Sequence, residues 1–144
     1  MDPTGNPVTR AGEITIVAVT QEVRVGVDIE FLKSVSDIPF MSGHFLTGRE
    51  KKAYSELDDA EKRGEFLACW TLKEACVKAA GLTIRRLVPK LDVCFNPQLI
   101  TIPSEDGNYN HGGPCYALTF TPAPQYVASI IVDLAKAHLN YYNY

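Results

Sequence analysis

Runs of alternating and β-branched residues predict strands near both ends of the chain. Residues 13–20 are mostly apolar and β-branched, a composition that favours a strand. Residues 23–30 alternate, with valine and isoleucine on one face and polar residues or glycine on the other. The short Gln21-Glu22 link predicts that these two strands form an antiparallel hairpin. Further strands are expected at 91–95, 99–102, 115–121 and 126–133.

Two helices are predicted between these strands. Thr47 and Glu50 have the spacing of a capping box, which opens a short helix. A longer helical pattern begins at Asp58, repeats its apolar positions every three or four residues, and stops at Gly81. Residues 31–46 contain proline and glycine and are expected to form a loop with a short helical turn. The predicted fold class is α+β, with an antiparallel sheet packed on one long helix plus shorter helices.

Length and composition predict a single domain. The chain has 144 residues, of which 46% are hydrophobic and 22% charged, and a net charge of −3. This composition excludes low-complexity disorder, and no apolar stretch approaches the roughly 20 residues of a membrane-spanning helix. We expect a lead-in segment at 1–12, one domain at 13–136 and a tail at 137–144.

The four cysteines are expected to be reduced thiols of a cytoplasmic protein. Cys69, Cys76, Cys94 and Cys115 include no CxxC pair, and the N-terminus has no secretory signal pattern. Small core residues are the simplest interpretation of the cysteines, because a zinc site would need more ligands at closer spacing.

Basic charge is concentrated in the middle third of the chain. Residues 47–90 contain ten basic and seven acidic side chains, a net charge of +3, whereas the segments on either side are each −3. This distribution suits an anionic partner. The mixed charges and the acidic total argue against nucleic acid. Alternatively, these basic side chains simply form the solvent-exposed surface of the helices.

Two carboxylates lie two residues apart on a predicted strand. Asp28 and Glu30 therefore leave the same face, and Gly26 on that face leaves room for a ligand. Neighbouring carboxylates repel each other unless a cation lies between them, and a hard cation such as Mg²⁺ is the natural occupant of such a site. The alternative is a polar strand face exposed to water.

The long helix adds a third carboxylate. Trp70, Glu74 and Lys78 are four residues apart and form a stripe, with Lys73 beside it. If this helix packs on the strand of Asp28, three carboxylates and two lysines converge, which is typical of phosphoryl transfer. A surface ion pair between Glu74 and Lys78 is the alternative.

Two motifs together resemble a known enzyme family. Val25-Gly26-Val27-Asp28-Ile29-Glu30 precedes Trp70-Thr71-Leu72-Lys73-Glu74-Ala75-Cys76-Val77-Lys78 by about 40 residues. Both resemble the signature of 4′-phosphopantetheinyl transferases, and the resemblance covers about residues 8–133. The motif forms resemble the second half of the two-half, surfactin-synthetase-activating type, which is related to holo-acyl-carrier-protein synthase. The resemblance implies that family's fold.

The resemblance also implies an activity and roles for individual residues. The enzyme would move the phosphopantetheine arm of coenzyme A to a serine of an acyl or peptidyl carrier protein and release adenosine 3′,5′-bisphosphate. Asp28, Glu30 and Glu74 would hold Mg²⁺, and Lys73 and Lys78 would contact the phosphates. Glu74 would act as the base for the carrier serine, either directly or through a metal-bound water. Lys78 would also assist the leaving phosphate.

The same resemblance places the carrier protein against one segment. Residues from about 31 to 53 correspond to the region that meets the carrier in this family, and the apolar side chains available there are Phe40, Met41, Phe45 and Leu46.

The chain departs from the family pattern in two ways. Where long members have Ser-His-Ser-Gly to hold the nucleotide, this chain has Thr9-Arg10-Ala11-Gly12, and Arg10 is the candidate phosphate contact. Its length matches neither the short trimeric members nor the two-half members. Three alternatives follow: a self-associating enzyme, a domain of a larger protein, or a non-catalytic domain that binds metal or carrier protein.

Overall fold

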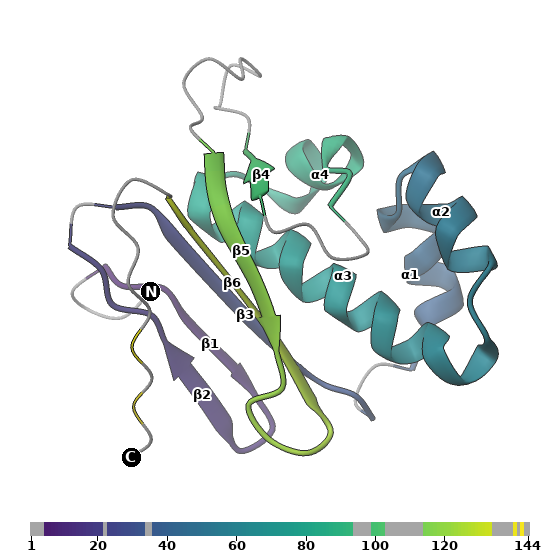
Figure 1. The fold of residues 1–144 in the computed structure, drawn as a ribbon, viewed down its shortest axis with the longest axis horizontal. Coiled ribbons are helices and arrows are strands. Elements are labelled where there is room, and N and C mark those ends of the chain that lie inside the picture. The colour runs from purple at the N-terminus through teal and green to yellow at the C-terminus, as the bar shows by residue number, and fades with distance from the viewer. Residues whose placement is uncertain are drawn as a thin grey trace.

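A long helix lies across one face of a four-stranded antiparallel sheet (Figure 1). The computed structural model describes residues 5–21, 23–33, 36–93, 99–102 and 114–133, together with residues 140 and 142. The helix is α3 (Asp59–Ala80), and the sheet order is β3 (Val25–Phe31), β6 (Tyr126–Asp133), β5 (Pro114–Phe120), β4 (Leu99–Thr101). This arrangement confirms the α+β class expected from the sequence.

The first two strands form a separate two-stranded sheet. β1 (Val8–Ala11) pairs antiparallel with β2 (Ile14–Val17), and β1 packs beside β3. The predicted hairpin between residues 13–20 and 23–30 is therefore wrong, because β3 pairs along its whole length with β6. β3 is buried on both faces, so it gains more from the long apolar β6 than from the short, half-exposed β2.

The predicted helices are confirmed, and two short ones are added. α2 (Gly48–Ser55) begins at the capping box of Thr47 and Glu50, and α3 ends at Gly81, whose φ of 65° suits glycine. The helical turn expected in 31–46 is α1 (Ile38–Phe45). α4 (Ile84–Leu87) and the 3-10 turn η1 (Val88–Lys90) were not predicted.

The segment after η1 differs from its prediction. A strand was expected at 91–95, but residues 91–93 are not in a strand, and the last two lie outside the described part. Leu91 and Val93 instead fill the core beneath α4 and η1.

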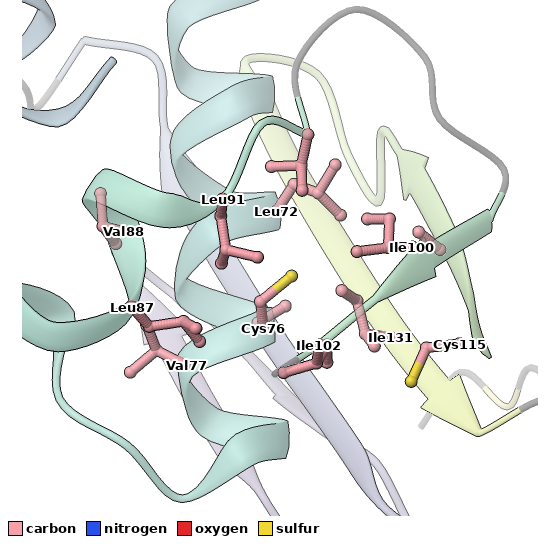
Figure 2. Close-up of a cluster of buried hydrophobic side chains, with 13 residues drawn as sticks. Leu72, Cys76, Val77, Leu87, Val88, Leu91, Ile100, Ile102, Cys115 and Ile131 are labelled. Carbon is pink, nitrogen blue, oxygen red and sulfur yellow. The ribbon is translucent and has the colours of Figure 1, made fainter. Parts of the chain in front are cut away.

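The main core lies between the sheet and α3, as Figure 2 shows. Leu72 and Cys76 of α3 meet Ile131 of β6, while Ile100 and Ile102 close one side. A second cluster, under α1 and α2, is built around Phe66, Leu67, Cys69 and Trp70. The two clusters fix α3 on the sheet from end to end.

The cysteine prediction needs one correction. Cys76 and Cys115 are buried thiols, as expected for core residues. Cys69, however, takes part in a disulfide, and Cys94 lies outside the described residues.

None of the described helices combines the length and apolar character needed to cross a membrane.

Candidate functional site

A glycine brings the long helix into direct contact with the carboxylate strand. A Cβ added at Gly26 would collide with the carbonyl oxygen of Ala75 and lie 2.8 Å from the amide nitrogen of Ala79. The sequence had suggested that this glycine leaves room for a ligand, which is wrong, because the backbone of α3 fills that space. The close approach sets Glu74 and Lys78 beside the carboxylates of β3.

Asp28 occupies the centre of this contact and is buried. Its Oδ1 accepts hydrogen bonds from Lys78 Nζ at 2.7 Å and from Thr9 Oγ1 at 3.0 Å. Its Oδ2 is also buried but has no hydrogen-bond partner among the described residues. Burial raises the pKa of Asp28, although the hydrogen bond and charge of Lys78 and the bond from Thr9 oppose that rise.

Glu30 and Glu74 complete a group of three coupled carboxylates. Burial and the charge of Asp28 raise the pKa of Glu30, while a hydrogen bond from Trp70 opposes the rise. Burial, followed by the charge of Asp28, raises the pKa of Glu74 to about 7, with a smaller contribution from Glu30 and an opposing one from Lys78. The structure thus brings together the strand pair and the helix stripe that the sequence singled out.

Lys78 links this group to a pocket. Its ammonium also donates to the carbonyl of Val27 at 3.1 Å, and its side chain is 31% exposed. An open pocket of about 310 Å³ adjoins it, lined by residues 5–7, the start of β3 and the end of α3. A phosphate in this pocket would be within reach of a lysine already directed at Asp28.

Lys73 is not part of this group. Its side chain is completely buried, and its ammonium lies 2.6 Å from Glu50 Oε2. The expected contact with coenzyme A phosphates does not agree with this position. The signal was in the sequence, since five residues turn an α-helix by about 140° and so send Lys73 and Lys78 to different sides.

In β1, Thr9 and not Arg10 contacts the carboxylate group. Arg10 is exposed, and its Nε donates to the carbonyl of Gly12 at 3.2 Å. Side chains alternate along β1, so the neighbouring Thr9 points inward to Asp28 and also accepts from the amide of Ile29 at 3.3 Å. Sequence reasoning missed Thr9 because it lies in the segment expected to be a lead-in.

The donor chemistry of the group fits a hard divalent cation. Three carboxylates and the unpaired Oδ2 of Asp28 are the oxygen ligands that Mg²⁺ prefers. Within the described ranges, no three acidic, cysteine or histidine side chains are already gathered closely enough to hold a metal ion. Lys78 instead neutralises part of the charge on Asp28.

Comparison with known proteins gives two matches. A sequence model described as the 4′-phosphopantetheinyl transferase superfamily matches residues 24–129. Over 84 residues the chain is 31% identical to the 4′-phosphopantetheinyl transferase HetI of Nostoc sp. strain PCC 7120. That alignment covers 58% of this chain and 35% of HetI, so the chain matches about a third of its relative's length. The matched region includes β3, α3 and the first half of β6.

Proposed function

Because this chain belongs to the 4′-phosphopantetheinyl transferase superfamily, we propose that it transfers the 4′-phosphopantetheine group of coenzyme A to a carrier-protein serine. The observation that supports this most directly is the meeting of Asp28, Glu30, Glu74 and Lys78 where α3 crosses β3. A pyrophosphate-cleaving site requires carboxylates and a cation, and here Lys78 both pairs with Asp28 and lines a pocket.

The proposed chemistry is one displacement at phosphorus. The serine Oγ of the carrier attacks the phosphorus next to pantetheine in the pyrophosphate of coenzyme A. A new P–O bond forms, the bridging P–O bond breaks, and adenosine 3′,5′-bisphosphate leaves. Glu74 takes the serine proton. Lys78 offsets the negative charge that develops on the leaving phosphate.

Asp28, Glu30 and Glu74 are the proposed holders of Mg²⁺. The buried, unpaired Oδ2 of Asp28 supports this, because such an oxygen is costly unless a cation or donor meets it. When bound, the metal supplies charge neutralisation to the pyrophosphate. Thr9 and Lys78 both engage Oδ1 and leave Oδ2 available.

The helices α1 and α2 are the proposed carrier-facing surface. Phe40 is 57% exposed, and Arg49, Lys51 and Lys52 on α2 are exposed too. An apolar side chain beside a basic helix suits an acidic partner. Of the apolar residues expected there, Leu46 is buried and Phe45 packs on Trp70, with ring centroids 4.8 Å apart.

A second unit is proposed to complete the nucleotide side of the site. The chain corresponds to about a third of HetI, and Arg10 lies away from the carboxylate group. That unit is either another copy or a further domain. Light scattering separates the two, since a dimer or larger species indicates a second copy and a monomer indicates another domain.

The expected cytoplasmic location stays a prediction.

Transfer is tested with the purified protein, Mg²⁺, coenzyme A and a panel of apo-carrier proteins, with mass spectrometry detecting the added phosphopantetheine. We expect the increment on at least one carrier. Glu74→Gln is expected to abolish transfer, because the amide cannot take the proton, and to weaken Mg²⁺ binding. Glu65→Gln, on the exposed face of the same helix, is the control and should transfer normally.

Two results would contradict the proposal. Normal transfer by Glu74→Gln would show that the site lies elsewhere. A folded wild-type protein that modifies no carrier would favour the alternative function, a non-catalytic or incomplete domain that binds metal or carrier protein.

A further inference from the structure

A completely buried lysine joins four parts of the chain that are distant in sequence. Lys73 of α3 donates to Glu50 Oε2 at 2.6 Å and to the carbonyl oxygens of Phe45 and Leu91, each at 2.9 Å. A fourth contact, to the carbonyl of Val88, measures 3.4 Å. The ammonium is therefore bonded to the end of α1, to α2, and to the turn after α4.

Glu50 extends the same network by accepting hydrogen bonds from two backbone amides. Its Oε2 also accepts the amide of Thr47 at 2.8 Å, which caps α2, and its Oε1 accepts the amide of Val93 at 2.8 Å. The two side chains are each 1% exposed. Burial lowers the pKa of Lys73, and the bond and charge of Glu50 oppose this shift.

Apolar packing alone does not place α2. Of its eight residues only Glu50 is buried, whereas an ordinary surface helix docks through an apolar stripe. A buried ion pair adds little net stability compared with apolar residues of the same size, but its hydrogen bonds are directional. The pair is thus suited to fixing where α2 lies.

We propose that the Lys73–Glu50 pair is a positioning device that fixes α1 and α2 on α3, and so sets how a partner docked on them meets Glu74. Lys73 directly precedes Glu74 on the helix, so the helix that carries the base also holds the docking segment. The hydrogen bonds of Lys73 and Glu50 support the placement of α1 and α2. The effect on carrier docking rests on the proposed function.

The test compares two neutralised ion pairs, each of which has its lysine on α3. Lys73→Met with Glu50→Gln removes the buried pair without leaving a lone buried charge. Lys62→Met with Asp59→Asn removes an exposed pair, whose ammonium and carboxylate are 2.7 Å apart. Both variants are first checked for folding by circular dichroism, and hydrogen exchange is then followed by mass spectrometry.

For the buried-pair variant, amides in residues 38–55 are expected to exchange about tenfold faster while those of β3 and β6 are unchanged. The KM for the carrier is expected to rise about tenfold and the KM for coenzyme A to stay within about twofold. A residue that only stabilises the fold would change the amount of active enzyme and not this ratio. The exposed-pair variant should match wild type in all readouts.

Three results overturn the proposal: unchanged exchange in 38–55, exchange that rises equally in β3 and β6, or an unchanged KM for the carrier. If the wild-type protein transfers nothing to any carrier, the proposed function fails, and hydrogen exchange alone then decides whether the pair places α1 and α2.

Discussion

A single threonine outside the two motifs controls the central carboxylate. Thr9 Oγ1 donates to Asp28 and accepts from the amide of Ile29, so it ties β1 to β3 and orients the carboxylate between them. Groups that hydrogen-bond a metal ligand orient it and so change the affinity for the metal. We therefore regard Thr9 as a positioning residue of the proposed magnesium site.

Thr9→Val tests this role, because valine keeps the shape and removes the hydroxyl. We expect Mg²⁺ affinity, measured by isothermal titration calorimetry, to fall about tenfold and the free energy of unfolding to fall by about 1 kcal/mol. Thr15→Val, at an exposed position of β2, should change neither. Undiminished Mg²⁺ affinity in Thr9→Val would remove Thr9 from the site.

At the scale of elements, the site depends on how closely α3 approaches β3. Gly26 permits this approach, since any side chain there would meet the helix backbone at Ala75 and Ala79. Backbone cannot move aside as the end of a flexible side chain can, so the helix itself would have to shift. Such a shift would separate Glu74 from Asp28.

Gly26→Ala is expected to lower the free energy of unfolding by about 3 kcal/mol, as overpacking of a rigid core does. Gly64→Ala is a matched substitution in α3, where an added Cβ meets nothing within 4 Å. It should raise stability by about 0.5 kcal/mol, because alanine favours a helix interior. Urea unfolding measures both, and equal stability of Gly26→Ala and wild type would refute the close contact.

At the scale of the whole molecule, the sheet joins β3 to β6, two strands that are about 100 residues apart in the sequence. Arg24 Nη2 lies 2.9 Å from Asp133 Oδ1, across the edge where β3 meets β6. Burial alone would raise the pKa of Asp133, but the hydrogen bonds from Arg24 and Cys115, with the charge of Arg24, outweigh it and lower that pKa. The pair thus stabilises the central strand pairing in a pH-dependent way.

The sign of this dependence follows from the lowered pKa. Asp133 contributes stability above its unfolded pKa of about 4, and the contribution is lost as the pH falls through the lower folded value. Since Arg24 is 35% exposed, the loss should not exceed about 1 kcal/mol. Urea unfolding at pH 7 and pH 3 should show a smaller acid loss for Asp133→Asn than for wild type. An identical acid loss of stability in Asp133→Asn and wild type would contradict the assignment.

The sequence by itself determined the local elements and most of the chemistry. Capping at Thr47, the glycine stop at Gly81 and the alternation of residues 23–30 depend on residues a few positions apart, so they can be recognised along the chain. The stripe of Glu74 and Lys78 and the face of Asp28 were predictable for the same reason. The family resemblance, confirmed by the match over residues 24–129, rests on those residues.

Only the tertiary structure decided what lies opposite each face. Periodicity tells which side chains share a side, but it does not name the element that covers them. For this reason β3 pairs with β6 instead of β2, the space above Gly26 holds α3, and Thr9 reaches Asp28. Lys73 shows the same limit, because its partners come from positions 45, 50, 88 and 91. Long-range burial selects such contacts, and it depends on the whole chain at once.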